Sequence, residues 1–592
     1  MKRTMMCGEV RPAHVGQAVV LQGWVHTVRD HGGLIFLDLR DRAGLVQVLV
    51  NPASAAQAHA AASQLHDEYV VEVHGQVERR PAGSENPRIA TGEVEIHASQ
   101  VDVLNASLPL PFPVAEEVAV DERLRLQYRY LDLRRPPMTR NMVMRHRVIK
   151  YIRDFMDAAG FLEIETPILA NPTPEGARDY LVPSRLHPGS FYALPQSPQQ
   201  YKQLSMVAGM DRYFQIARCF RDEDLRANRA VEFTQLDLEM SFVEPEDVFA
   251  VCEELFTGLT ESLTSKQVWK KPWPRLTWRT AMDQYGSDKP DLRYELPIVD
   301  VSEIAGATDF QVFRGAVESG GVVRGVRAPG AAGFTRRQID ELTELAKAAG
   351  ARGLAWAALG AGEVRSPFAR FLADGQQAAL WSALGAGQGD LVLLVADNLE
   401  VTRASLGRLR TELARRLDLI PPDVVAWAFV TEFPWFERDA TTGRLTFMHH
   451  PFTMPYDEDL PLLDTDPLCV RAKAYDIVAN GEEHASGSIR VHRPEIQNKL
   501  FELLGYSPER IQSNFGHILN AFRFGAPPHG GIAPGLDRIL CMLLDEDNLR
   551  EVIPFPKNQS AQDLMMGAPA PVQPEQLEEL HLRLVEPAPV VS

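Results

Sequence analysis

Apolar and polar positions alternate along the first hundred residues in the manner of β-strands. Five runs rich in Val, Ile and Leu are separated by turns that contain Asp or Gly, and several repeat with a period of two. The expected strands are 19–28, 34–39, 45–50, 69–77 and 93–104, with a helix over 54–65 whose N-cap is Ser54. Five short antiparallel strands with a helix in that place predict an OB-type barrel. Such a barrel binds oligonucleotides or serves as a protein-interaction module, and the pattern leaves both uses open.

Beyond position 107 the pattern changes to a hinge and then to alternating helices and strands. Three prolines within residues 108–113 exclude regular helix and central strand there. Apolar residues at helical spacing predict a helix over 141–160, followed by a strand over 161–167. Two antiparallel strands joined by a charged loop are expected at 213–220 and 233–242.

These elements predict a multidomain α+β protein. A length of 592 residues fits about three or four domains. Residues 296–419 are rich in Ala and Gly and predict a small inserted α+β unit. The expected parts are a barrel (1–106), a hinge (107–140), the first part of a main domain (141–294), an inserted α+β domain (295–422), the second part of the main domain (423–567) and a C-terminal extension (568–592).

The formal net charge of −18 does not favour a nucleic-acid partner for the chain as a whole, because phosphate contacts need Lys and Arg. A local patch is enough for binding, however, and residues 121–153 carry ten Lys and Arg against three Asp and Glu. Contact with nucleic acid and a solvated helical face both remain open for this patch. Five scattered cysteines, no signal sequence and no long apolar run predict a cytoplasmic protein without membrane contact.

Two clusters carry candidate chemistry. The first strand of the predicted hairpin delivers Arg221, and the second carries Gln235, Asp237 and Glu239 at alternate positions of one face. A guanidinium on a rigid strand suits a phosphate, although a surface hairpin with ion pairs gives the same pattern. In the second cluster, a glycine-rich turn at 531–535 opens an apolar helix that carries Arg538. This arrangement predicts an anion site or close packing.

Together the two clusters resemble motifs 2 and 3 of class II aminoacyl-tRNA synthetases, and residues 161–167 resemble motif 1, the dimer-interface strand of that family. Four further strings narrow the resemblance to bacterial aspartyl-tRNA synthetases: TPEGARD at 173–179, LPQSPQQYK at 194–202, YGSDKPD at 285–291 and MHHPFT at 448–453. The similarity runs along essentially the whole chain. It implies an N-terminal OB-type anticodon-binding barrel, a class II catalytic domain built on an antiparallel sheet, an inserted α+β domain and a homodimer.

The resemblance also implies a reaction. ATP activates L-aspartate to aspartyl-adenylate with Mg²⁺ as cofactor, and the 3′ end of tRNA(Asp) then takes the aspartyl group. Catalysis by positioning and charge neutralisation requires no protein nucleophile.

The family's site residues carry over onto matching positions of this chain. Arg221 and Arg538 are the expected catalytic residues on the α- and γ-phosphates, and Lys202 and Arg490 are expected to bind the side-chain carboxylate of aspartate. The resemblance implies that Asp476 and Glu483 are the Mg²⁺ ligands. Their spacing fits two helical turns or a hairpin, and two ordinary surface carboxylates would show the same pattern. The full aspartate set is Glu175, Ser197, Gln199, Lys202, Arg221, Asp237, His449 and Arg490, and the ATP set is Arg221, Asp222, Glu223, Glu483, Gly535, Leu536, Asp537 and Arg538.

Four barrel residues match anticodon-reading positions. Phe36 is expected to stack on a base and Gln47 to bond to one, with Arg29 and Glu95 beside them. The alternative for Phe36 is a place in the barrel core.

Several positions depart from the family pattern. Ala230 replaces a glutamine that contacts ATP, residues 484–487 replace a glycine-rich run, and Thr27 and Val28 replace two arginines. His31 and Gly83 resemble the non-discriminating branch, which also aspartylates tRNA(Asn) for a later amidotransferase. We therefore expect charging of both tRNAs, with strict tRNA(Asp) specificity and neutral drift at these loops as the alternative.

Two rival functions fit these residues less well. A synthetase for asparagine or lysine is disfavoured because Lys202 and Arg490 together suit an anionic substrate side chain. An inactive paralogue that only binds RNA is disfavoured by the presence of Arg221, Arg538 and both predicted metal carboxylates, although the altered residues 484–487 keep it open.

Overall fold

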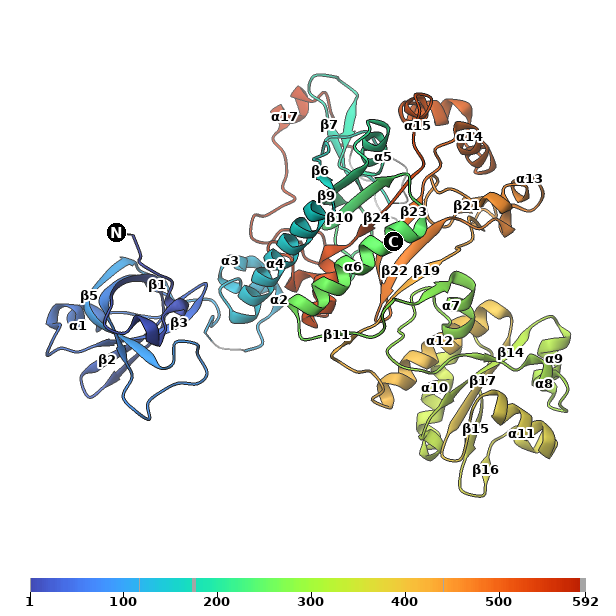
Figure 1. Ribbon diagram of the computed structural model, residues 1–592, viewed down its shortest axis with the longest axis horizontal. Coiled ribbons are helices and arrows are strands. Elements are labelled where there is room, and N and C mark those ends of the chain that lie inside the picture. The colour runs from blue at the N-terminus through green and yellow to red at the C-terminus, as the bar shows by residue number, and fades with distance from the viewer. Residues whose placement is uncertain (1, 116–117, 173–176, 440, 586–592) are drawn as a thin grey trace. The chain divides into compact units, whose positions relative to one another are not determined.

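The computed structural model describes residues 2–115, 118–172, 177–439 and 441–585 (Figure 1). The chain forms two compact units, each described by itself below. One consists of Met1–Val143 with Arg550–Ala570, and the other of Met144–Leu549 with Pro571–Ser592. The finer division into six parts stays a prediction.

The N-terminal strands close into a barrel in the order β1-β2-β3-β5-β4. Alternate residues such as Ile35, Leu37 and Leu39 fill its core, as the period of two predicted. The prediction of an all-antiparallel barrel is wrong for one pair, because β3 and β5 run parallel where the barrel closes. The strands are β1 (Ala18–His31), β2 (Leu34–Asp41), β3 (Gly44–Val50), β4 (Val70–Arg79) and β5 (Val94–Asn105).

The predicted cap of the barrel helix is also wrong. Helix α1 (Ala56–Ala62) begins after Ala55, which makes no side-chain cap. Asn51 instead accepts a hydrogen bond from the Ala53 amide, and the resulting turn contains Ser54 and delays the helix.

Several cations of the basic segment after the barrel form ion pairs. The guanidinium of Arg125 lies 2.9 Å from Asp132 and 2.6 Å from Glu551, and Arg134 lies 2.9 Å from Glu68. Arg123, Arg140 and Arg147 of the same segment are exposed, so nucleic-acid contact and a solvated helical face both stay predictions for it. The segment forms α2 (Glu122–Gln127), α3 (Arg129–Asp132) and α4 (Pro136–Ala158), and α4 begins earlier than the expected residue 141 because prolines are well tolerated in a first helical turn.

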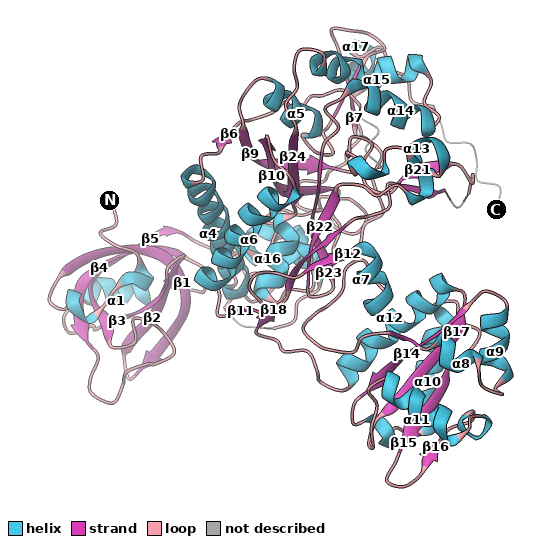
Figure 2. Cartoon of the chain, turned by 45° about the vertical axis from the view of Figure 1, so that its right-hand side comes forward, coloured by secondary structure: helices cyan, strands magenta, loops and turns pink. Residues whose placement is uncertain are grey.

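The second unit contains an eight-stranded sheet in the order β12-β19-β22-β23-β24-β10-β9-β6, antiparallel except at its two edges (Figure 2). The predicted hairpin is confirmed as β9 and β10, whereas the expected strand over 161–167 is only two residues long. The strands are β6 (Leu162–Glu163), β9 (Arg212–Phe220), β10 (Glu232–Ser241), β12 (Arg275–Thr277), β19 (Trp427–Thr431), β22 (Ala474–Ala479), β23 (Glu482–Ile489) and β24 (His529–Pro534). Helices α5 (Gln199–Val207), α6 (Pro245–Leu263) and α16 (Leu536–Leu544) pack on this sheet.

The predicted inserted unit is a five-stranded sheet with helices on both faces (Figures 1 and 2). Alternate residues of β17 separate two cores: Leu391, Leu393 and Val395 face α10 and α12, while Val392 and Leu394 face α8, α9 and α11. The strands are β13 (Val299–Asp300), β14 (Val322–Ala328), β15 (Ala355–Leu359), β16 (Val364–Arg365) and β17 (Leu391–Asp397). The helices are α8 (Ser302–Gly306), α9 (Gln311–Glu318), α10 (Arg336–Ala348), α11 (Asp374–Ala383) and α12 (Leu399–Arg416).

The insert leaves and re-enters the large sheet at neighbouring strands. The chain departs after β12 and α7 (Trp278–Tyr285) and returns through β19, which pairs in parallel with β12. A second parallel pair, β11 (Gln267–Val268) with β18 (Val424–Val425), joins the same two segments.

The remaining elements lie around the large sheet and in the C-terminal segment. They are β7 (Leu181–Pro183), β8 (Phe191–Ala193), β20 (Phe436–Arg438), β21 (Leu445–Phe447), α13 (Leu462–Thr465), α14 (Pro494–Leu503), α15 (Pro508–Phe522) and α17 (Pro574–Glu579). None of the helices in the described part of the chain combines the length and apolarity needed to span a membrane.

Candidate active site

A cavity of about 430 Å³ opens on the large sheet. Its walls come from the start of α5, from β10, from β23 and β24, from the start of α16 and from the segment around residue 450. The predicted residues that line it are Ser197, Gln199, Lys202, Arg221, Glu223, His449, Glu483, Arg490, Gly535, Asp537 and Arg538.

Buried charges form a network at one side of the cavity. Lys202 Nζ lies 2.7 Å from Asp237 Oδ1 and 3.4 Å from Glu239 Oε2. Arg490 donates to both oxygens of Glu239, from Nε at 2.9 Å and from Nη2 at 3.2 Å. It also donates from Nη1 to Ser488 Oγ at 2.7 Å. Asp237 and Glu239 are alternate residues of β10, so the strand aims both carboxylates at one face.

The two cations and two carboxylates balance in charge. Burial raises the pKa of Asp237, against the opposing effect of Lys202. Burial also acts to raise the pKa of Glu239, but Arg490 and Lys202 outweigh it and lower that pKa. Asp237 and Glu239 therefore offset part of the positive charge that Lys202 and Arg490 present to a substrate. Selection of an anionic side chain depends on how these cations are shared between the substrate and β10.

The two arginines that are predicted to bind phosphates, Arg221 and Arg538, both line the cavity. The Arg221 guanidinium lies over the Phe233 ring, 5.0 Å from its centroid, and its buried Nε has no hydrogen-bond partner among the described residues. Arg538 donates to the main-chain oxygen of Glu483 at 2.9 Å. The carboxylate of Asp537 accepts hydrogen bonds from Arg145 at 2.5 Å and from the Thr234 amide at 2.9 Å. These bonds fix the start of α16 to β10 and α4.

The two predicted magnesium ligands lie on the β22–β23 hairpin. Asp476 pairs with Ser486 and Glu483 pairs with Val478, on either side of a bulge. Burial and the Asp476 carboxylate raise the pKa of Glu483. A divalent cation offsets the repulsion between the buried Asp476 carboxylate and the partly buried Glu483 carboxylate, so the donor pair fits Mg²⁺.

His449 lies next to this pair. Its Nε2 is 3.1 Å from Asp476 Oδ1, and its ring packs 4.1 Å from that of Phe433. Burial acts to lower the pKa of His449, but Asp476 outweighs burial and raises it. The histidine therefore joins the predicted aspartate pocket to the predicted metal ligands.

The four predicted anticodon residues lie on one outer face of the barrel. Arg29 pairs with Phe36 across β1 and β2, and its Nη2 donates to Asp38 Oδ1 at 3.0 Å. Gln47 on β3 donates to Glu95 on β5 at 2.7 Å. Phe36 is half-buried and is not part of the barrel core, so the alternative that it is a core residue is wrong.

Known proteins match both units. Residues 121–559 match the family model described as tRNA synthetases class II (D, K and N), and residues 19–104 match the OB-fold nucleic acid binding domain. Aspartate–tRNA(Asp/Asn) ligases from Moorella thermoacetica and Rubrobacter xylanophilus are each 54% identical to this chain, covering 98% and 99% of it and 97% of each relative. The aspartate–tRNA ligase of Geobacillus kaustophilus is 51% identical over 99% of this chain and 100% of its own.

The chain belongs to the aspartate–tRNA ligase family of class II synthetases. Solved structures agree in fold. Asparaginyl-tRNA synthetase from Pyrococcus horikoshii, complexed with asparaginyl-adenylate, superposes with a TM-score of 0.59 at 19% identity, over 94% of this chain and 98% of that one. Aspartyl-tRNA synthetase from Entamoeba histolytica gives 0.56 at 20% identity, over 94% and 92%.

Some residues that the family resemblance assigned to the site do not line the cavity. Asp237 and Asp476 lie directly behind Lys202 and His449. Leu536 is fully buried, and Asp222 lies 3.6 Å from Arg178 near the surface. Glu175 lies outside the described residues.

Two of the departures from the family pattern lie in the cavity wall. Ala230 lines the cavity, and residues 484–487 form the middle of β23. His484 is buried with its ring 5.4 Å from Trp427. A side chain at Gly487 would meet the Gly531 carbonyl oxygen at 2.3 Å, so β23 and β24 leave no room there.

Sequence reasoning assigned no role to several residues that the fold brings to this family's site. Glu239 is the partner of Arg490 from 251 positions away. Thr453, Ser488 and His450 line the cavity. The alternation of Gln235, Asp237 and Glu239 was the signal for Glu239, but no local pattern pointed to the others.

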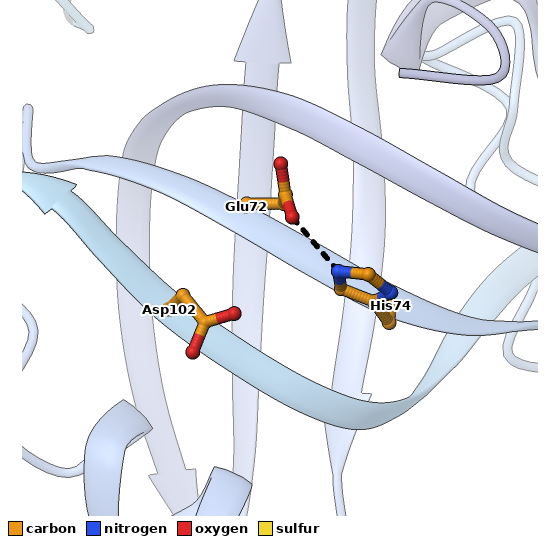
Figure 3. A group of neighbouring side chains, drawn as sticks. All are labelled: Glu72, His74 and Asp102. Carbon is orange, nitrogen blue, oxygen red and sulfur yellow. Dashed lines mark hydrogen bonds and ion pairs between the residues drawn. The ribbon is translucent and has the colours of Figure 1, made fainter. Parts of the chain in front are cut away.

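A separate group of potential metal ligands lies on the barrel (Figure 3). Donor atoms of Glu72, His74 and Asp102 lie within 4.8 Å of one another. Glu72 is already bonded by His74 at 2.8 Å and by Gln22 at 2.6 Å. Asp102 accepts a further hydrogen bond from Gln100 at 2.7 Å, so ordinary hydrogen bonds account for the cluster.

Proposed function

We propose that the chain joins L-aspartate to the 3′ ends of tRNA(Asp) and tRNA(Asn) at the expense of ATP. The observation that carries the proposal is that the Lys202–Arg490 network and two further arginines, Arg221 and Arg538, line the same cavity. The first pair suits the amino acid and the second suits the phosphates.

The reaction has two steps. An oxygen of the aspartate α-carboxylate attacks the α-phosphorus of ATP, and the bond from that phosphorus to the bridging oxygen breaks to release pyrophosphate. A terminal ribose hydroxyl of tRNA then attacks the acyl carbon of aspartyl-adenylate, and AMP leaves. Arg221 and Arg538 stabilise the charge that develops on the phosphates, while Lys202 and Arg490 orient the amino acid.

Asp476 and Glu483 are the residues that would hold Mg²⁺, which supplies charge neutralisation on the phosphate oxygens. His449 orients Asp476 through its Nε2 contact. Glu175 and Ser197 belong to the aspartate site in this proposal by family resemblance.

Amino-acid-dependent exchange of pyrophosphate into ATP tests the activity. We expect exchange with aspartate and none above background with asparagine or lysine. Exchange with asparagine alone would show that the substrate is asparagine. No exchange with any amino acid would support an inactive paralogue that only binds RNA.

The tRNA scope is tested by charging purified tRNA(Asp) and tRNA(Asn) transcripts side by side. His31, at the end of β1, packs edge-on against Phe36 with 6.0 Å between ring centroids, and so lies beside the proposed base-stacking surface. Gly83 lies in the loop after β4 with open space around it. We expect aspartylation of both tRNAs. Charging of tRNA(Asp) alone would restrict the activity to one tRNA.

Replacing Phe36 by alanine is expected to raise the KM for tRNA by about 10- to 100-fold, the loss that one base-stacking platform produces. Pyrophosphate exchange should be unchanged, because this reaction does not involve the anticodon. Initial rates of aspartylation and of exchange, measured on the same preparation, check both parts. A matched control is Tyr69→Ala, which removes another barrel aromatic that packs against the core. An unchanged KM in Phe36→Ala would remove Phe36 from the anticodon site.

The proposal includes a homodimer. The short strand β6 forms an edge of the large sheet, and Leu162 on it is 51% exposed. An apolar residue on an open edge suits pairing with a second copy. An amidotransferase partner is expected only if the enzyme also aspartylates tRNA(Asn), since that product needs later amidation.

A further inference from the structure

The YGSDKPD string at 285–291 is family-specific, yet the proposed reaction gives it no task. It forms the loop that leaves α7 and leads into the inserted domain. Asp288 and Lys289 in this loop form an ion pair at 3.1 Å and are partly exposed, at 38% and 42% of their side chains. The string therefore places two opposite charges on the connection between the large sheet and the inserted domain.

Helix α12 of the inserted domain packs directly on the start of this loop. Gly286 has a φ of +69°, and a side chain there would meet the Arg403 carbonyl oxygen at 2.3 Å and Gly407 Cα at 2.8 Å. Just before the loop, Arg403 donates to Asp283 at 2.5 Å, and Arg324 of β14 donates to the same carboxylate at 2.8 Å. The insert therefore fixes the beginning of the loop from two of its elements.

Arg410 of the same helix fixes the end of the loop. Its side chain is almost fully buried, and its guanidinium lies over the rings of Tyr285 and Tyr294, 4.8 and 4.3 Å from their centroids. A planar guanidinium held between two aromatic rings has little conformational freedom. Its hydrogen bonds go to main-chain oxygens of Asp291 at 2.6 Å, Tyr294 at 3.0 Å and Leu296 at 3.1 Å.

The held loop lies against the hairpin that carries the predicted metal ligands. A side chain built on Gly481, at the turn of β22–β23, would contact the Cβ of Asp291 at 3.5 Å. Charge effects agree with this placement. Against burial and Asp476, which raise the pKa of Glu483, Arg538 and Lys289 act to lower it. Asp288, the partner of Lys289, acts in turn to raise the pKa of His449, so both charges of the loop lie within electrostatic reach of the hairpin and of the histidine bonded to it.

We propose that the inserted domain, through Arg410 and Gly286, positions Lys289 beside the Asp476–Glu483 hairpin, where its ammonium attracts the triphosphate of ATP. The inference rests on the proposed function, because it takes the hairpin as the phosphate end of the ATP site. Lys289 is a positioning residue: it acts through the field at the hairpin and forms no bond in the reaction. The insert thus contributes to the ATP site without lining the cavity.

A lysine in this place should weaken the binding of a free metal cation and strengthen the binding of a polyphosphate. Removing it should strengthen Mn²⁺ binding to the nucleotide-free enzyme and weaken ATP binding, each by about three- to tenfold, the size expected of one charge within a Debye length. A purely structural role would not move the two affinities in opposite directions.

The experiment compares the wild-type enzyme with Lys289→Met and Lys289→Arg. Mn²⁺ affinity without nucleotide is measured by electron paramagnetic resonance, and ATP affinity by calorimetry. We expect the opposite shifts in Lys289→Met and near wild-type values in Lys289→Arg. Shifts of the same sign, or no shift in either affinity, would overturn the proposal. Wild-type pyrophosphate exchange is measured separately, so failure of the proposed function is distinguished from failure of this inference.

A double-mutant cycle tests whether the inserted domain acts on ATP binding through Lys289. Arg410→Gln should weaken ATP binding in the wild-type background and have no further effect in the Lys289→Met background. Arg408→Gln, on the same helix with an exposed side chain, is the matched control and should leave ATP affinity unchanged. Additive losses in the double variant would show that Arg410 does not act through Lys289. If Arg410→Gln does not fold, Gly286→Ala replaces it in the cycle with the same expected outcome.

Discussion

Replacing Lys202 by methionine is expected to lower kcat/KM for aspartate in pyrophosphate exchange by about 10³-fold, because breaking a buried ion pair costs roughly 3–5 kcal/mol. The side chain is 1% exposed and lies between Asp237 and Glu239, whose own side chains are fully buried. Without the ammonium, two carboxylates face the substrate, and one of them would repel the side chain of aspartate.

The loss should appear in aspartate binding, with the affinity for ATP unchanged. Calorimetric titration with each substrate separates the two effects, and thermal unfolding reports whether the variant still folds. Lys150→Met serves as the matched control, since Lys150 is 64% exposed and pairs with Asp154 on the surface of α4. An unaltered KM for aspartate in Lys202→Met would exclude Lys202 from the substrate site.

Arg221→Ala is expected to slow adenylate formation at saturating substrates by about 10²- to 10³-fold, the loss caused by removing one donor to a developing negative charge. The buried Nε, without a partner among the described residues, is available for such an acceptor. Single-turnover quench-flow of aspartyl-adenylate measures this rate without product release.

The control for Arg221 lies three residues earlier on the same sheet. Arg218 donates to Thr234 and pairs with Glu232, and it does not line the cavity. Arg218→Ala should form adenylate at the wild-type rate. If Arg221→Ala also retains the wild-type rate, the α-phosphate contact belongs to another residue.

Regular patterns made the elements predictable, and their ends were predicted less well. The period of two placed Leu37 and Leu39 in the barrel core because each strand there has one buried face. The Ser54 cap failed because the Asn51 turn comes first. The strand expected over 161–167 is short, because only its first two residues pair with β9 at the edge of the sheet.

The site was predictable in its residue types and only partly in its contacts. The family motifs pointed to Lys202, Arg490 and Asp476, but the partners of these residues depend on sheet register. Glu239 meets Arg490 because β10 and β23 both pair with β24, an arrangement that no local spacing encodes. Lys289 was visible in a family-specific string, yet its relation to Glu483 depends on packing by a helix more than a hundred residues away.

The parallel pairing of β12 with β19 has a consequence for how this protein acquired its architecture. Because the insert begins and ends on adjacent strands, its termini are already close, and closing so long an excursion costs only a little more chain entropy than closing a short one. Whole modules are therefore free to be gained, lost or exchanged at this point during evolution without altering the registry of the catalytic sheet.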